Sequence, residues 1–362
     1  MLRQESLSDG GQLLRVDDPR WQALLLRCDS DAYHQRGYLE AAAEVEEGDL
    51  RIALVEAAGV TMGVPLMLRR LPFGMDGWDA VSPYGYPCPI ATAQTPGQWS
   101  LLWQALRRLL AEEDIVSAFF RLHPLLTPPD CLQAVALEDT VVEHGDCVYL
   151  RLDQEEQALW SETRPRFRSN INALRRDGWR FVADDWSLLP EFLAIYSATM
   201  RRADAESFYY FPLSYYQSLR AGLGGDATLH AVLDPAGEVA TIGLFLRHGT
   251  LVQYHLGGTA AAHIQAAPAK LLFHEVRLWY RSAGATLLHL GGGLGGRRDS
   301  LYRFKAGFSK CARPFCSLRM VVDPSRYRAL VDTWSRAAGA VPATPEGYFP
   351  AYRAAVTSAA SC

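Results

Sequence analysis

Helical and extended spacings of hydrophobic residues alternate along the chain, and the same order of segments occurs in both halves. In 98–112, Leu102, Leu106 and Leu109 recur at intervals of three or four residues, which predicts a helix with one apolar face. Short apolar and β-branched runs bounded by turn residues predict strands. Each half is expected to contain two helices, antiparallel strands, a further helix and a returning strand. The first half has expected helices at 19–28, 35–46 and 98–112, and strands at 50–56, 60–68, 115–122 and 141–152.

The second half repeats this order, although no close sequence repetition joins the two halves. The order is typical of the acyltransferase fold called GNAT, so we predict an α/β (α+β) chain with two such domains in tandem. Each domain would be a mixed, mostly antiparallel twisted sheet flanked by helices. The predicted domains are 1–152 and 153–325, followed by a C-terminal tail, 326–362, that is helical with loose ends. Expected helices of the second half are 189–202, 213–221 and 269–283, and its strands are 227–233, 239–247, 251–256, 286–290 and 314–322.

Composition fits a globular protein of two domains and disfavours several other classes. The 362 residues are 49% hydrophobic and 21% charged. No apolar run reaches the roughly 18 residues that a membrane helix needs, and the first residues lack the apolar core of a signal peptide. The seven cysteines are scattered without a CxxC pair, which predicts reduced thiols in the cytoplasm and no structural zinc site. The net charge of −4 disfavours a protein that wraps a long duplex, but a local patch can still hold a short piece of nucleic acid.

A glycine run follows the expected strand at 286–290. Residues 291–296 read Gly-Gly-Gly-Leu-Gly-Gly and contain the pattern GxGxxG. A dinucleotide site would also need a long helix and a parallel strand after the loop, and neither is expected here. Two interpretations remain: a flexible or tightly packed loop, or a loop at Gly291, Gly292 and Gly293 whose bare backbone lets a substrate approach closely.

A short helix is expected directly after this loop. Asp299 or Ser300 can cap its start and Gly307 can end it, with Leu301, Phe304 and Phe308 as anchors. This helix would hold Arg303 and Lys305 rigidly beside the glycines. Only three of the 36 basic residues are lysines, so Lys305 carries particular weight. The two cations are either solvated, or one of them faces a phosphate or a developing oxyanion.

Six arginines lie between Thr163 and Arg180. Pro165 can begin a helix there, with Phe167, Ile171 and Leu174 as its buried stripe. At 100° per residue, three arginines fall within about 40° of one another on one flank. That flank is either a solvated face or a phosphate clamp, for which the guanidinium geometry is suited. The three residues of the flank are Arg164, Arg168 and Arg175.

A Pro/Gly-rich loop is expected from Pro72 to Pro96, and three prolines stiffen its segment 80–89. Tyr84 and Tyr86 flank a glycine in this segment. The segment is either an ordinary surface loop or the aromatic wall of a substrate site.

Several motifs are absent from the sequence. No HExxH, GxSxG or GxxxxGK[ST] pattern occurs, and the histidines show no metal-ligand spacing. A CoA-dependent enzyme of the GNAT type normally carries [QR]-x-x-G-x-[GA] before the helix that follows its antiparallel strands. The corresponding residues here are Gln265 to Lys270, where both glycine-type positions fail and Pro268 lacks an N–H.

With these motifs, the chain resembles the Fem-like (peptidoglycan cross-bridge) aminoacyltransferases and related double-GNAT proteins. The resemblance spans most of 50–322 and is strongest at 267–308, which ends in Phe-Lys-x-Gly-Phe. Ser-Pro-Tyr-Gly-Tyr at 82–86 and the arginine-rich helix are also similar. The long coiled-coil arm of some members has no counterpart here.

The resemblance implies transfer of an aminoacyl group from the acceptor end of aminoacyl-tRNA to a small or peptidyl amine. The acceptor would be a peptidoglycan precursor or a natural-product intermediate, and no bound cofactor or metal would be needed. It further implies that Lys305 lies near the reacting centre, and that Arg168 and Tyr254 meet substrate phosphate. We assign Lys305 to catalysis and expect substrate to contact Tyr84, Tyr86, Arg164, Arg168, Arg175, Tyr254, Arg303 and Phe304.

Two other functions remain open at this point. One is an acyl-CoA-dependent N-acyltransferase with the same fold. The other is a non-catalytic GNAT-fold protein that binds a sugar or nucleotide and leaves donor and acceptor unchanged.

Overall fold

The computed structural model describes residues 10–135, 139–339 and 347–355. Its contacts divide the chain into two compact units, each made of more than one segment. Unit 1 comprises Met1–Ser30, Glu46–Glu143 and Cys316–Cys362, and unit 2 comprises Asp31–Val45 and His144–Phe315. The domain boundaries expected after residues 152 and 325 stay a prediction.

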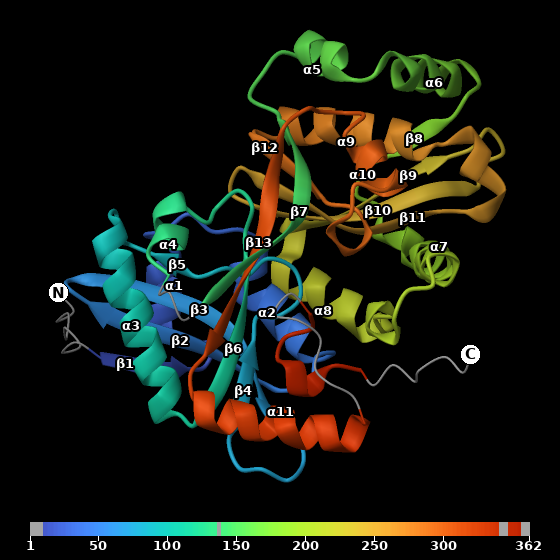
Figure 1. Ribbon diagram of the computed structural model, residues 1–362. Coiled ribbons are helices and arrows are strands. Elements are labelled where there is room, and N and C mark those ends of the chain that lie inside the picture. The colour runs from blue at the N-terminus through green and yellow to red at the C-terminus, as the bar shows by residue number, and fades with distance from the viewer. Residues whose placement is uncertain (1–9, 136–138, 340–346, 356–362) are drawn as a thin grey trace. The chain divides into compact units, whose positions relative to one another are not determined.

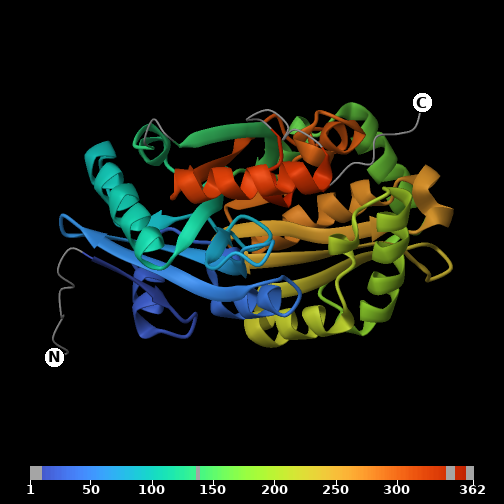
Figure 2. The same ribbon diagram turned by 60° about the horizontal axis from the view of Figure 1, so that its bottom comes forward.

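A mostly antiparallel sheet forms the centre of unit 1. β4 and β6 are the parallel neighbours in it, while β1–β2, β2–β3, β3–β4 and β6–β13 are antiparallel. Helices α1 (Pro19–Leu25) and α3 (Pro96–Glu112) lie on opposite faces of its first strands (Figure 2). The order of strands is β1 (Gly10–Leu14), β2 (Asp49–Ala57), β3 (Val60–Arg70), β4 (Trp78–Val81), β6 (Ile115–Leu122) and β13 (Ala312–Val321), and β5 (Ile90–Ala91) pairs with β3.

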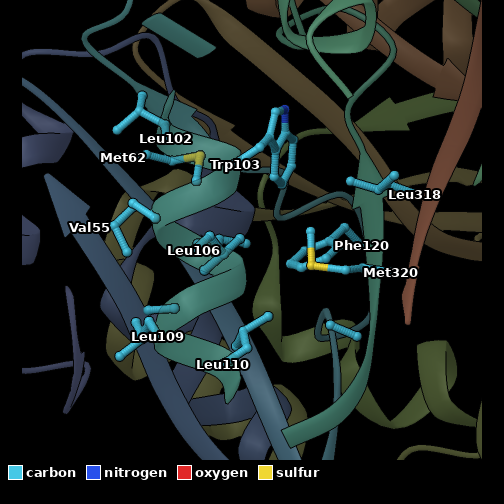
Figure 3. Close-up of a cluster of buried hydrophobic side chains, with 14 of the residues drawn as sticks. Val55, Met62, Leu102, Trp103, Leu106, Leu109, Leu110, Phe120, Leu318 and Met320 are labelled. Atoms are coloured by element: carbon cyan, nitrogen blue, oxygen red, sulfur yellow. The ribbon is translucent and has the colours of Figure 1, made fainter. Parts of the chain in front are cut away.

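The core of unit 1 lies between α3 and this sheet (Figure 3). Leu102, Leu106 and Leu109 are buried along one face of α3, as the spacing of apolar residues predicted. The indole of Trp103 also lies in this core and donates a hydrogen bond to the carbonyl of Cys131, at the centre of the short helix α4 (Pro129–Gln133), at 3.1 Å. Each such buried side chain stabilises the fold by about 1.5–3 kcal/mol relative to an exposed one.

The end of the described chain is also part of unit 1. Helix α11 (Pro324–Ala338) is capped by Asp323, and its buried Leu330 and Trp334 pack against β6 and its surroundings. Farther along, Tyr352 donates a hydrogen bond to the buried Asp79 of β4 at 3.2 Å. The expected helical tail therefore forms a helix over 324–338, and its expected loose ends fall partly outside the described residues.

Unit 2 is built on its own group of paired strands, in which β11 and β12 are parallel and the other pairs are antiparallel. Helix α9 (Ala269–Ser282) covers one face, whereas α7 (Leu189–Arg202) and α8 (Leu213–Leu223) cover the other (Figure 1). Helix α6 (Pro165–Arg176) packs on α9 and follows the short α5 (Glu156–Glu162). The order of strands is β7 (Thr140–Arg151), β12 (Leu287–Gly291), β11 (Leu251–Thr259), β10 (Val239–His248), β9 (Ala227–Leu233) and β8 (Arg180–Val182).

Residues 31–45, which we call the N-terminal arm, complete unit 2. The arm contains α2 (Arg36–Ala43), which packs on α8. The helices approach so closely at Gly37 and Gly222 that a Cβ on Gly37 would lie 2.3 Å from the carbonyl carbon of Gly222. The arm also makes buried polar contacts, because the carboxylate of Asp31 accepts a hydrogen bond from Gln253 Nε2 on β11 at 2.9 Å. Part of the first half of the sequence is therefore a structural component of the second unit.

The sequence predicted most of these elements but missed the short ones. The expected loop 72–96 contains β4 and β5, and β1, β8, α4 and α5 were not expected. β4 is confined to four residues between glycine- and proline-rich turns, and its parallel partner β6 comes more than 30 residues later. Such non-local pairing leaves no local periodicity to detect.

Two further findings concern the helices and the cysteines. Of the helices in the described residues, none combines the length and the hydropathy needed to cross a bilayer. The six cysteines that the structure describes are free thiols.

Candidate active site

The glycine run forms a tight loop at the end of β12. This glycine loop, 291–296, is held at its far end by Asp299, whose Oδ2 accepts a hydrogen bond from the Leu294 amide at 3.1 Å. Asp299 Oδ1 accepts from the Tyr302 amide at 2.9 Å and so caps α10 (Ser300–Lys305). The expected cap is confirmed, and one carboxylate fixes the loop relative to the helix.

Bare backbone is necessary where this loop meets β7. Gly296 has φ +76°, and a Cβ built on it would lie 1.6 Å from the carbonyl oxygen of His144. The interpretation as a tightly packed loop therefore holds for this end of the run. A dinucleotide site is not formed, since α10 has six residues and the strand after it, β13, pairs antiparallel with β6.

The Lys305 side chain is buried at the C-terminal end of α10. Its Nζ donates a hydrogen bond to the carbonyl oxygen of Gly292 at 2.7 Å and lies 6.0 Å from the ring centroid of Tyr254. No carboxylate among the described residues forms an ion pair with it. Burial lowers the pKa of Lys305 to about 8, because the charged form loses hydration. An ammonium of this kind, with unused N–H groups, is suited to stabilise a negative charge on a ligand.

The Tyr254 ring near Lys305 belongs to a cluster of aromatic side chains. Phe304 and Phe308 lie 5.6 Å apart, and Phe273 of α9 contacts both of them and also Tyr254 at 4.8 Å. Burial raises the pKa of Tyr254, so its hydroxyl stays protonated. This apolar surrounding keeps the local dielectric low, which strengthens the field of the ammonium.

The prediction that Leu301 anchors α10 is wrong. Leu301 is 37% exposed, whereas Phe308 is fully buried and Phe304 packs against the same core. Phe167 of α6 takes the third position, with its ring 5.7 Å from Phe304 and 5.3 Å from Phe308. The other cation of α10, Arg303, is exposed and donates to the carbonyl of Arg298 at 3.3 Å.

The three arginines on the flank of α6 have different partners. Arg164 precedes the helix; its Nη1 donates to the carbonyl of Arg303 at 3.0 Å, and its backbone amide donates to Gly307 at 2.9 Å. Arg175 donates two hydrogen bonds, of 3.0 and 2.6 Å, to one oxygen of Glu275. Arg168 is half-buried, and its side chain makes no hydrogen bond or ion pair with any residue that the structure describes. Among the described residues, Arg164 and Arg168 thus pair with no carboxylate, and Arg168 is the arginine of the flank whose side chain makes no hydrogen bond.

The two tyrosines of the loop 80–89 belong to unit 1. The amide of Tyr84 donates to the Glu46 carboxylate at 2.8 Å, and the Tyr86 ring lies 5.7 Å from that of His123. Burial raises the pKa of Glu46 to about 7. Nothing in the sequence distinguished this carboxylate, because it is one of several glutamates at the end of the predicted helix 35–46. The roles expected for Tyr84 and Tyr86 stay predictions.

The start of α9 offers few free amides to a pyrophosphate. Pro268 has no N–H, and the amides of Lys270, Leu271 and Leu272 already donate to the carbonyls of Ala267 and Pro268 at 2.9–3.2 Å. The carbonyl just before them, Ala266 O, accepts from Asn170 of α6 at 3.1 Å. The anion-binding arrangement of a helix N-terminus is therefore largely occupied here.

Comparison with known proteins agrees with this architecture. Residues 161–306 match a family described as an acetyltransferase (GNAT) domain. A 168-residue stretch is 29% identical to UDP-N-acetylmuramoylpentapeptide-lysine N(6)-alanyltransferase from Weissella viridescens, covering 45% of this chain and 49% of that enzyme. The chain therefore spans about half the length of this curated relative.

Solved structures extend the likeness to both units. The crystal structure of FemX has a TM-score of 0.68 at 13% identity, with 88% of this chain and 99% of that chain covered. L-PGS from Bacillus licheniformis has a TM-score of 0.54 at 14% identity, with 88% and 95% covered. These likenesses confirm the predicted fold class: an α/β chain with mixed, mostly antiparallel sheets and two GNAT-like units.

Proposed function

We propose that this chain, which has the GNAT acyltransferase fold and is similar to Fem-like proteins, transfers an aminoacyl group from aminoacyl-tRNA to the amine of a small or peptidyl acceptor. The relative from Weissella viridescens is named for adding alanine to a lysine amine of a UDP-linked peptide. A peptidoglycan precursor is therefore one candidate acceptor, and a natural-product intermediate is another. The cytoplasm, where charged tRNA is made, is the proposed location.

The buried ammonium of Lys305 is the observation that supports this proposal. In the reaction, the acceptor nitrogen attacks the ester carbonyl and forms a tetrahedral intermediate with a negatively charged oxygen. The C–O bond to the tRNA ribose then breaks, and the ribose oxygen leaves with a proton from the attacking amine. An activated ester needs positioning and oxyanion stabilisation rather than a protein nucleophile. The remaining N–H groups of Lys305, set among aromatic rings, are suited to hold that oxyanion.

The occupied N-terminus of α9 favours aminoacyl-tRNA over acyl-CoA as donor. Isothermal titration is expected to show no CoA or acetyl-CoA binding tighter than roughly millimolar, or about −4 kcal/mol. The match to an acetyltransferase family is the observation on the side of CoA. Micromolar binding of CoA would overturn the tRNA proposal in favour of the acyl-CoA alternative.

The reaction itself is tested by reconstitution. The full chain is incubated with tRNA, ATP, synthetases, labelled amino acids and candidate amines, and the amide is detected by mass spectrometry. Product is expected only while the tRNA is intact, so RNase added before the enzyme abolishes it. Product from acetyl-CoA alone contradicts the proposal, and ligand binding with unchanged donor and acceptor would identify a binding protein.

Arg168 is expected to contact a substrate phosphate, which gives a separate prediction. Arg168→Ala should raise KM for the phosphate-bearing substrate by roughly 10- to 150-fold, the scale of losing one charged hydrogen bond. The melting temperature should hardly change, because the Arg168 side chain makes no hydrogen bond or ion pair with a described residue. Arg175→Ala should have a smaller effect, since that side chain already pairs with Glu275.

Arg166→Ala is the matched control for these variants. It lies on the same helix but about 160° from Arg168, so KM should stay near the unaltered value. If Arg168→Ala lowers the melting temperature and leaves KM unchanged, the side chain is structural and the phosphate contact is wrong.

A further inference from the structure

A second concave site lies in unit 2 between α5, α6 and α9. This Trp160 pocket has a volume of about 530 Å³. None of its lining residues belongs to the glycine loop or to α10. The lining residues are Glu156, Gln157, Trp160, Asn172, Arg175 and His274.

The deepest of these side chains, His274, has one defined hydrogen-bond donor. The residue is 2% exposed, and its Nδ1 lies 2.7 Å from Nη2 of Arg277. A guanidinium can only donate, so Nδ1 accepts and the proton of the neutral ring sits on Nε2. Nε2 has no hydrogen bond with any residue that the structure describes. Burial, aided by Arg277 and Arg175, lowers the pKa of His274 to about 3, so the ring stays neutral.

Arg277 is fixed in this role by its other contacts. Its Nη1 donates to the carbonyl of Leu159 at 3.1 Å and to Thr163 Oγ1 at 2.8 Å. The guanidinium is fully buried and also lies over the ring of Phe308 at 5.8 Å. The His274 donor is therefore pre-oriented before any ligand arrives.

The wall and rim of the pocket supply complementary groups. The half-buried indole of Trp160 lies 4.9 Å from the His274 ring and offers an aromatic face. Asn172 and Gln157 contribute amides and Glu156 contributes a carboxylate, and none of these three side chains hydrogen-bonds to a described residue. Arg168 precedes Asn172 by one turn on the same face of α6.

These groups select a particular class of ligand. A cation is disfavoured by Arg277, Arg175 and the Nε2–H donor, whereas Glu156 disfavours an anion inside the pocket. A flat neutral ring fits, with an acceptor toward His274, donors toward the rim and a face on Trp160. We propose that the Trp160 pocket binds the base of a nucleotide, with the nucleotide phosphate toward Arg168. This binding does not depend on the acyl transfer proposed above.

Equilibrium binding to the full chain tests this proposal. Isothermal titration with uridine and adenosine 5′-monophosphate is expected to show at least one of them binding ten or more times as tightly as ribose 5-phosphate. Trp160→Ala should weaken that nucleotide by about 10-fold or more, as expected for losing the stacking of one base. Ribose 5-phosphate binding should not change.

Two further variants separate a local effect from loss of folding. Trp179→Ala removes another partly buried tryptophan of unit 2, which contacts His263 at 5.4 Å, and should leave nucleotide affinity unchanged. Glu156→Gln changes only an exposed rim carboxylate. It should shift the affinity ratio of the two nucleotides without changing the melting temperature.

The nucleotide can come from a small substrate or from the end of an RNA, and the trinucleotide CCA distinguishes these sources. If CCA binds at least tenfold more tightly than adenosine monophosphate and Trp160→Ala removes this gain, the pocket takes an RNA end. Equal affinities indicate a small nucleotide substrate. The proposal is overturned if no nucleotide or trinucleotide binds below about 10 mM, if ribose 5-phosphate binds equally well, or if Trp160→Ala and Glu156→Gln leave binding unchanged. Because no turnover is measured, such a failure leaves the acyl transfer untouched.

Discussion

Lys305→Ala is expected to lower kcat by about 10²–10³, the scale of removing one donor from an oxyanion site. KM for either substrate should change far less, because the carbonyl oxygen carries little charge before attack. Lys305→Arg should restore little activity, since a planar guanidinium does not fit where the ammonium sits beside Gly292 and Tyr254. Steady-state kinetics and circular dichroism of the purified variants measure both effects.

The pH dependence gives Lys305 a second signature. Its pKa of about 8 lies below the usual 10.5, so kcat should fall as pH rises through about 8 and the ammonium loses its proton. At pH values between these two pKa values, the unfolded chain binds more protons than the folded chain. The free energy of unfolding should therefore rise with pH in this range. Both dependences should be absent in Lys305→Ala.

Lys310→Ala is the matched control, because this exposed lysine lies five residues farther along the chain. Its kinetics and pH profile should equal those of the unaltered protein. A folded Lys305→Ala enzyme with near-native kcat would remove Lys305 from the mechanism.

Gly296→Ala is expected to lower the free energy of unfolding by about 3 kcal/mol or to displace the glycine loop from β7. The new Cβ would lie 1.6 Å from a backbone carbonyl oxygen, and φ is +76°. Backbone on both sides of this contact prevents a side-chain adjustment. Because Gly292 of the same loop holds Lys305, kcat should fall as well. Urea unfolding and steady-state kinetics provide the measurements.

Gly295→Ala separates the clash from the backbone conformation. Gly295 also has a positive φ, of +57°, but nothing lies within 4 Å of an added Cβ. Gly295→Ala should lower the free energy of unfolding by only about 1 kcal/mol. Equal costs for the two substitutions would show that the loop does not depend on the contact with His144.

The local parts of the site could be predicted because their signals are local. Asp299 precedes a short apolar helix at the spacing of an N-cap, and the lone lysine in Phe-Lys-x-Gly-Phe identified the buried cation. The stripe of Phe167, Ile171 and Leu174 followed from helical periodicity, and Ile171 and Leu174 are buried as expected.

The remaining parts depend on contacts between distant residues. Three arginines on one flank predicted unmet charge, but Glu275, 100 positions from Arg175, neutralises one of them. Phe167 displaced Leu301 as an anchor for the same reason, since α6 and α10 meet only in the folded unit. The Trp160 pocket is lined by three helices. Its hydrogen-bond donor, His274 Nε2–H, is defined by the contact of His274 with Arg277. Periodicity alone would have placed these two residues on an apolar face of α9.

The discontinuous composition of the units has a consequence for biosynthesis. The N-terminal arm leaves the ribosome long before β11, which supplies Gln253 to the buried Asp31. At the usual rates of translation this interval lasts on the order of ten seconds. For most of it, α2 lacks its partner helix α8, and unit 1 also waits for residues 316–321. Unit 2 can therefore complete its fold only after Phe315 has been made, and unit 1 only after its last segment, which begins at Cys316. A fragment such as 153–325 lacks both the arm and β7.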